Sequence, residues 1–184
     1  ARETDAGVYL HVGPEIGVAS TKAFTGQLTV LTMLAMSLAR RRHMSIGQYE
    51  GLLRELASLP DKVKAALDES DHIRSIVAKH LDQNNWLFLG RGLNYPVALE
   101  GALKLKEISY IHAEGMPAAE MKHGPIALID EGMPVVFVVP RGRQYDKALS
   151  NIEEVRARGG RVLAVADEDD ARIVRHAEAV FRVP

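Results

Sequence analysis

The sequence contains no cysteine and no apolar run long enough to cross a bilayer. The lack of cysteine among 184 residues excludes disulfides, thiolate metal sites and a cysteine nucleophile from this segment. The longest apolar stretch, residues 28–39, is interrupted by Thr29, Thr32 and Ser37 and falls short of the roughly 20 apolar residues that a span needs. We therefore expect a buried helix there, no membrane partner and a cytoplasmic location.

Excess charge of one sign is also missing. Lysine and arginine number 23 and the acidic residues 24, so no net positive field would draw the protein onto nucleic acid. Any bound phosphate must therefore be held locally. The first residues, Ala-Arg-Glu-Thr-Asp, lack a starting methionine and an apolar targeting region. We expect a chain truncated at both ends, taken from the middle of a longer protein.

The second half of the sequence alternates apolar runs with helical patterns. Residues 86–90 form an apolar run followed by Arg91-Gly92 and a helix that opens near Pro96; further strands are expected at 134–140, 161–167 and 180–183, with a helix at 144–158. Alternation at this spacing predicts the α/β class, a doubly wound parallel sheet flanked by helices, as in flavodoxin-like folds. Ligands of such sheets bind beyond the carboxyl ends of the strands.

The first half is expected to be mostly helical. A short strand is predicted at residues 8–12, followed by a glycine-containing loop and a helix at 21–42 capped by the hydroxyls of Ser20 or Thr21. Two more helices are predicted at 46–57 and 61–81, the second broken near Ser70. These patterns divide the chain into a first domain remnant (1–45), a helical linker (46–83) and a second domain without its final elements (84–184).

The predicted helix at residues 97–111 carries the most informative side chains. Glu100, Lys104 and Glu107 recur at i, i+4 and i+7 and so share one helix face. One interpretation is a solvated face with an ordinary ion pair. The other is a general base, Glu107, beside a cation, Lys104, which is the pair of roles that proton transfer between adjacent sugar carbons requires.

Residues 112–125 are rich in ionisable groups yet contain glycine, proline and alanine, which predicts a loop or short helix with a function. His112 and His123 can be structural histidines, or one of them an acid/base for opening a cyclic sugar. No spacing here matches a metal-ligand signature, so we expect no metal. Gly90-Arg91-Gly92 lacks the rest of a dinucleotide fingerprint and is interpreted as a tight turn.

Three motifs carry a family resemblance. Residues 103–114 (LKLKEISYIHAE) and 122–130 (KHGPIALID) closely resemble the second sugar-isomerase (SIS) domain of glucosamine-6-phosphate synthases. Upstream, residues 13–25 (GPEIGVASTKAFT) resemble the end of the first such domain, and residues 150–160 resemble a later helix. The resemblance covers essentially the whole chain and implies an SIS-type fold.

Roles follow from the resemblance where residues match. It implies that Glu107 transfers the proton between C2 and C1 of the sugar, that Lys104 assists as a cation, and that His123 opens the sugar ring from the neighbouring subunit. Val18, in the loop with Ala19 and Ser20, resembles the position whose backbone touches the sugar.

The resemblance also implies partners. They are fructose 6-phosphate and glucosamine 6-phosphate as ligands, a glutaminase domain in the parent chain and a second copy in a homodimer, with no cofactor. The family's glutaminase domain, phosphate-holding serine and threonine loops and C-terminal lysine are absent from these 184 residues. Two alternatives remain open: a stand-alone SIS-fold amino-sugar-phosphate deaminase or isomerase, and a non-catalytic phosphosugar-binding module.

Overall fold

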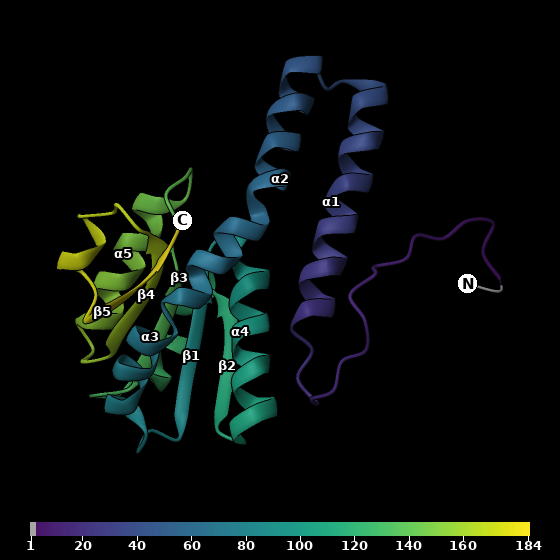
Figure 1. Ribbon diagram of the computed structural model, residues 1–184. Coiled ribbons are helices and arrows are strands. Elements are labelled where there is room, and N and C mark those ends of the chain that lie inside the picture. Colours follow the sequence, from purple (N-terminus) through teal and green to yellow (C-terminus); the bar gives the residue numbers. More distant parts are fainter. Residues whose placement is uncertain (1–2) are drawn as a thin grey trace. The chain divides into compact units, whose positions relative to one another are not determined.

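The computed structural model describes residues 3–184, which divide into two compact units, one ending at Asp61 and the other beginning at Lys62. The first unit contains an antiparallel pair of helices, α1 (Lys22–Arg42) and the first turns of α2 (Ile46–Asp68) (Figure 1). A capping box begins α2: the Gln48 amide N–H donates to Ser45 Oγ (3.2 Å), and Ser45 N–H donates to Gln48 Oε1 (3.0 Å). These reciprocal bonds allow the sharp turn between the helices.

The predicted strand at residues 8–12 is wrong. This segment is irregular, with Val8 and Tyr9 exposed and His11 at a positive φ of 54°, and Figure 1 draws it as a coil. A strand needs a neighbouring strand for its backbone hydrogen bonds, and none of the described strands pairs with it.

The helices after α1 also differ from the prediction in one place. Helix α2 continues through Pro60 instead of ending at residue 57. The expected break near Ser70 is confirmed, because α2 ends at Asp68 and α3 (Ser70–Val77) begins after one residue, followed by the short 3₁₀ helix η1 (Ala78–His80).

The second unit is built on a parallel sheet. Within the described residues it has five strands, β1 (Asn85–Gly90), β2 (His112–Pro117), β3 (Pro134–Val138), β4 (Arg161–Asp167) and β5 (Ala179–Val183), in the order β2-β1-β3-β4-β5. Every pairing is parallel. The predicted doubly wound α/β fold is confirmed, and its strand order is that of flavodoxin-like sheets.

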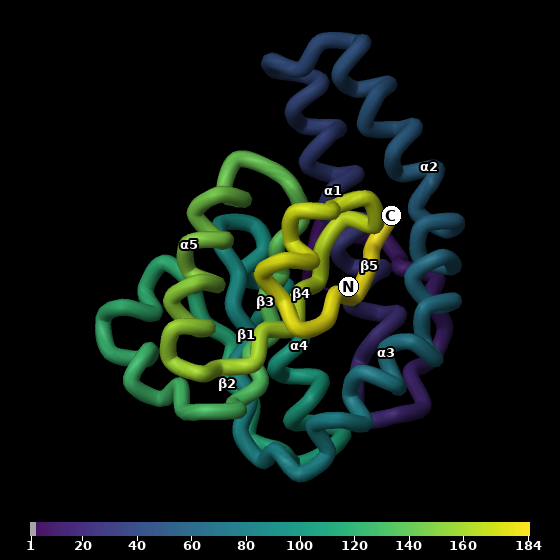
Figure 2. The backbone as a smooth tube through the Cα atoms, turned by 90° about the vertical axis from the view of Figure 1, so that its left-hand side faces the viewer, coloured from purple at the N-terminus to yellow at the C-terminus, as the bar shows by residue number. Residues whose placement is uncertain are grey.

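Helices cover both faces of this sheet (Figure 2). Helix α4 (Asn94–Ser109) connects β1 to β2 and shares one face with α3, whereas α5 (Tyr145–Arg156) connects β3 to β4 on the other face. Two apolar clusters reflect this arrangement. One contains Leu87, Leu89 and Ile152, and the other contains Trp86 with Ala102. The strand residues alternate between the clusters because successive side chains point to opposite faces.

Small residues bring α4 close to the sheet. Ala98 and Ala102 are its buried residues, and a Cβ added at Gly115 of β2 would lie 2.6 Å from Leu99 Cα. The helix therefore packs backbone against backbone and presents its larger side chains elsewhere. Leu99 and Leu103, which neighbour the charged side chains on the same helix, are each 40% exposed.

Strand β2 replaces part of the loop that the sequence predicted at residues 112–125. It pairs with β1 from His112 to Pro117 at the edge of the sheet, and two short 3₁₀ helices follow, η2 (Ala118–His123) and η3 (Pro125–Leu128). Another 3₁₀ helix, η4 (Ile173–Arg175), precedes β5. Proline and glycine are tolerated in β2 because an edge strand has only one neighbour to bond.

Candidate active site

The charged face of α4 places three side chains in contact. Lys104 Nζ lies 2.6 Å from Glu107 Oε2 and 3.3 Å from Glu100 Oε1. The three side chains are only 21–27% exposed, so they are partly withdrawn from solvent. This contact is a direct consequence of helical spacing, since residues three and four apart lie on the same face. The predicted face is therefore present, with Lys104 at its centre.

Lys104 is held in its charged form. The hydrogen bond to the Glu107 carboxylate raises the pKa of Lys104 above its ordinary value, and Glu100 adds to the effect in spite of some desolvation. Two carboxylates around one ammonium keep that ammonium in place at neutral pH. Such a fixed cation can stabilise an oxyanion that develops when a neighbouring base removes a proton from carbon.

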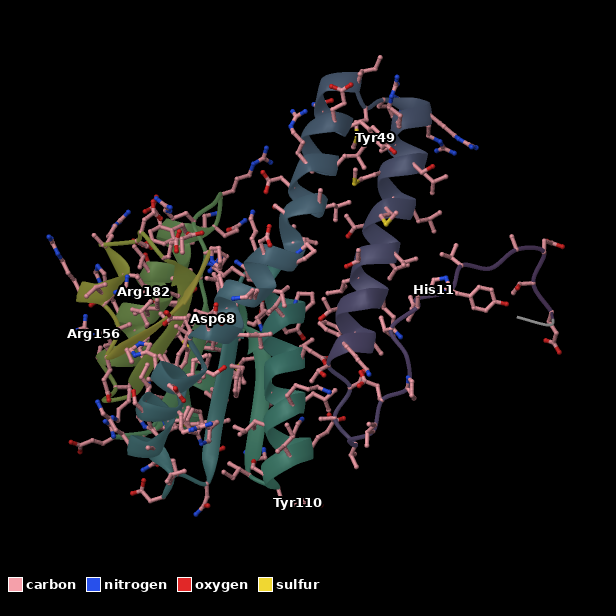
Figure 3. All side chains as sticks on the ribbon, in the orientation of Figure 1. His11, Tyr49, Asp68, Tyr110, Arg156 and Arg182 are labelled. Carbon is pink, nitrogen blue, oxygen red and sulfur yellow. The ribbon has the colours of Figure 1, made fainter. Side chains whose placement is uncertain are left out.

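His123 is not brought to this pair within one chain. It ends η2, its side chain is 75% exposed, and its Nε2 lies 3.9 Å from Glu120 Oε2. This segment follows the carboxyl end of β2. Helix α4, which carries Lys104 and Glu107, runs in the opposite direction and ends next to the start of β2, at the residue Tyr110 labelled in Figure 3. Six strand residues, about 17 Å of extended chain, separate these two ends of the sheet.

The loop with Val18, Ala19 and Ser20 belongs to the first unit. Val18 is 90% exposed, and Ser20 Oγ donates a long hydrogen bond of 3.5 Å to Glu15 Oε1. The expected hydroxyl cap of α1 is wrong, because neither Ser20 nor Thr21 caps the helix with its side chain. Sequence reasoning missed Glu15, whose position seven residues before the first residue of α1 gives no local capping signal.

The Glu15 carboxylate caps α1. Its Oε1 accepts hydrogen bonds from the backbone N–H groups of Thr21 (3.1 Å) and Ala23 (2.9 Å). The bond from Ala23 is the main reason that the pKa of Glu15 lies below its ordinary value, and the other bonds and Lys22 contribute. A carboxylate is favourable here because the first turn of a helix carries unpaired N–H groups and partial positive charge. Glu15 thereby fixes the loop that contains Val18.

Residues 3–184 hold no group of three or more histidine, aspartate or glutamate side chains placed to share a metal ion. In the same part of the chain, none of the helices has the length and apolar character that a membrane span requires.

The expected turn at Gly90 is confirmed: a Cβ there would lie 2.2 Å from Asn94 O, and Gly92 has a positive φ of 57°. The strand therefore passes into α4 with almost no intervening chain.

The strand order and the helices on both faces define a doubly wound α/β domain with a charged carboxylate–lysine face on its first crossover helix. Residues 81–184 match the SIS domain family, and the chain belongs to that family.

Similar proteins extend the match over the whole chain. The glutamine–fructose-6-phosphate aminotransferase (isomerizing) of Chlorobaculum tepidum is 61% identical over 183 residues, which cover 100% of this chain and 30% of that protein. Among solved structures, the C-terminal domain of glucosamine-fructose-6-phosphate aminotransferase from Francisella tularensis is 44% identical, with a TM-score of 0.87 over 93% of this chain and 48% of that one. A glucosamine-6-phosphate deaminase from Thermotoga maritima is 26% identical, with a TM-score of 0.61 over 83% of this chain and 44% of that one.

Proposed function

We propose that this chain is part of the isomerase half of a glutamine–fructose-6-phosphate aminotransferase. The observation that carries the proposal is 61% identity, over the full length of this chain, to a protein of that name, although the chain spans only about 30% of that relative. The deaminase alternative has weaker support, because the deaminase structure is 26% identical. In the proposed reaction fructose 6-phosphate and glutamine-derived ammonia become glucosamine 6-phosphate.

The chemistry that we assign to α4 is proton transfer. After ring opening and attack of ammonia at C2, an isomerase must remove a proton from one sugar carbon and return it to its neighbour. Glu107 is proposed as the base. Lys104, 2.6 Å from Glu107, is proposed to stabilise the negative charge that develops on the sugar oxygen. Both groups lie on a helix, which holds them more rigidly than a loop would.

Two further parts of the proposed site are His123 and the loop at residues 18–20. Because His123 lies toward the opposite end of the sheet from Glu107, we propose that a second copy of the chain supplies it in a homodimer. Val18, Ala19 and Ser20 are proposed to contact the sugar, with Glu15 holding the loop in shape. Residues 1–45 would then end a first SIS domain, 46–83 would form a linker, and 84–184 would belong to a second SIS domain of a cytoplasmic enzyme.

The test follows nitrogen from glutamine. The full chain, with the flanking segments that it naturally carries, is given fructose 6-phosphate and glutamine labelled with ¹⁵N in its amide. We expect ¹⁵N in the amino group of glucosamine 6-phosphate, detected by mass spectrometry. Release of ammonia from glucosamine 6-phosphate without use of glutamine would favour the deaminase. Sugar phosphate that binds and is never converted would favour the binding module.

A further inference from the structure

Residues 150–160 contribute to the family resemblance but have no role in the site described above. They include the second half of α5, in which Ile152 and Val155 are fully buried in the core. Two polar side chains of this helix, Asn151 and Glu154, are three residues apart and therefore lie on the same face. Their contacts lead away from the helix to the segment that carries His123.

The side-chain amide of Asn151 is buried and is bonded at both ends. The residue is 5% exposed. Its Oδ1 accepts a 2.8 Å hydrogen bond from the guanidinium of Arg91, in the turn after β1, and its Nδ2 donates a 3.2 Å bond to Glu154 Oε2. Turning the amide over would place its oxygen against a carboxylate and its NH2 group against a guanidinium. The amide therefore holds one oxygen of Glu154 in a fixed place relative to the sheet.

The other oxygen of Glu154 binds η2. Glu154 Oε1 lies 2.7 Å from Lys122 Nζ, and the two side chains are 25% and 59% exposed. An isolated ion pair of this exposure contributes little to stability, because solvent screens it and two flexible side chains must be ordered. Here the carboxylate is already oriented by Asn151, so less freedom is lost when it binds the lysine. The pair is therefore suited to fixing the position of η2.

Lys122 directly precedes His123, whose own side chain is held weakly within one chain. Among residues 3–184 the imidazole has no hydrogen bond, since its Nε2 lies 3.9 Å from Glu120 Oε2. The residue that follows, Gly124, has a φ of 134° and restrains the backbone less than any other residue type would. The position of the imidazole consequently depends on the Lys122 side, where Met121 is also fully buried.

We propose that Glu154 is a positioning residue for His123. Through Lys122 it holds the imidazole in place to open a sugar ring bound by the neighbouring subunit. This inference rests on the proposed function, in which His123 opens the ring. An acid or base must lie within hydrogen-bond reach of the group that it serves, and a displacement of about 1 Å can cost about a hundredfold in rate. Glu154 itself does not contact the sugar and acts only through His123.

The test compares two substrates with the full chain, including the flanking segments that it naturally carries. Fructose 6-phosphate must be opened, whereas 5-deoxyfructose 6-phosphate lacks the hydroxyl that closes the furanose ring. Glutamine is the second substrate, and the amino sugar formed is measured by mass spectrometry. We expect Glu154→Gln to lower kcat for fructose 6-phosphate by about tenfold, part of the 10²- to 10⁴-fold effect of a positioned acid or base. Its kcat for the open-chain analogue should equal that of the wild type.

Three further variants serve as controls. Glu153→Gln removes the same charge from the next residue of α5, where the carboxylate bonds Arg156 and His176, and should leave both rates unchanged. Lys122→Gln removes the other partner of the ion pair and should reproduce the loss seen with Glu154→Gln. Lys122→Arg keeps the charge and should retain the wild-type preference between the substrates. A purely structural role of Glu154 would lower the two rates together and lower the melting temperature.

A double substitution shows whether Glu154 acts through His123. In the His123→Ala protein, Glu154→Gln should cause no further loss of the residual activity with fructose 6-phosphate, because the group that it positions is already missing. Additive losses would overturn the proposal. An equal loss with both substrates, or a Glu154→Gln protein with the wild-type kcat for fructose 6-phosphate, would overturn it as well.

The His123→Ala protein alone separates this inference from the function on which it rests. If it keeps the wild-type kcat for fructose 6-phosphate, the proposed role of His123 is wrong, and the positioning role of Glu154 is wrong with it. If His123→Ala loses activity with fructose 6-phosphate and Glu154→Gln does not, only the positioning role is overturned.

Discussion

At the scale of single residues, the most informative contacts are those made by carboxylates. Glu107 and Glu100 hold Lys104 charged on one helix face, and Glu15 gathers two backbone N–H groups at the start of α1. The first arrangement provides a cation beside a possible base. The second arrangement gives shape to an exposed loop. Among the described residues of that loop, only the Glu15 side chain bonds to the backbone at the start of α1.

Glu15 makes the stability of the first unit depend on pH. Its pKa is lower in the folded chain than its ordinary value of 4.5, so its contribution is fully present above about pH 4.5 and is lost as pH falls through the lowered value. Glu15→Gln keeps an acceptor oxygen but removes the charge. We expect the wild type to melt at a higher temperature than this variant at pH 7, as measured by circular dichroism, and the difference to shrink as the pH falls below 4.5. A difference that stays constant over this range would contradict the charged cap.

At the scale of elements, α4 and β2 form the part of the fold that positions the proposed base. Their separation is set by Gly115, where any Cβ would meet the backbone of Leu99 at 2.6 Å. These backbone atoms cannot avoid the added Cβ by a change of rotamer, as a flexible side chain could. The distance between helix and strand is therefore sensitive to a single methyl group.

Gly115→Ala is expected to destabilise the second unit by about 1–3 kcal/mol, the usual cost of overpacking. The single tryptophan, Trp86, is buried in β1 and reports this unit in urea unfolding followed by fluorescence. Gly51→Ala is the matched control: it lies within α2 with no atom near the added Cβ, and should stabilise that helix by about 0.5–1 kcal/mol. An unchanged midpoint for Gly115→Ala would mean that α4 can move away from the sheet freely.

Elements that the sequence predicts well are those with a strong local pattern. Strand β3 is a continuous apolar run, and α5 ends at Arg156, shortly before Gly159, whose positive φ of 82° is expected of a glycine that follows the end of a helix. Strand β2 was missed because its residues include Gly115 and Pro117, which have low strand propensity, and because pairing with β1 is a long-range interaction. The segment 8–12 has the opposite problem, since it has strand composition but pairs with none of the described strands.

The same distinction applies to the candidate site. The Lys104–Glu107 contact could be predicted because i,i+3 spacing on a helix is local. The position of His123 could not, because it depends on the pairing of β2 with β1, which is a long-range interaction. The cap by Glu15 was missed for a similar reason, since the irregular loop between Glu15 and α1 determines which N–H groups the carboxylate reaches.

At the scale of the whole molecule, the position of His123 argues for a site shared between subunits. If a second copy supplies this histidine, the inactive variants Glu107→Gln and His123→Ala should complement each other when mixed and allowed to exchange subunits. Each mixed dimer then contains one complete site, so about a quarter of wild-type activity should return. Mixtures that stay inactive although the subunits exchange, shown by differently tagged chains, would mean that His123 acts within its own chain.

The role proposed for Glu107 is the transfer of a proton between neighbouring sugar carbons. The most direct measurement is the incorporation of deuterium from heavy water at C1 of fructose 6-phosphate and at C2 of any aldose phosphate formed from it. It is followed by proton NMR with the full chain, Glu107→Gln and the control Glu100→Gln. Glu100 shares the helix face and also contacts Lys104, at 3.3 Å, so its variant removes the same charge without removing the proposed base. We expect exchange with the wild type and Glu100→Gln, and none with a Glu107→Gln protein that still binds the sugar phosphate. Exchange by Glu107→Gln at the wild-type rate would contradict the account.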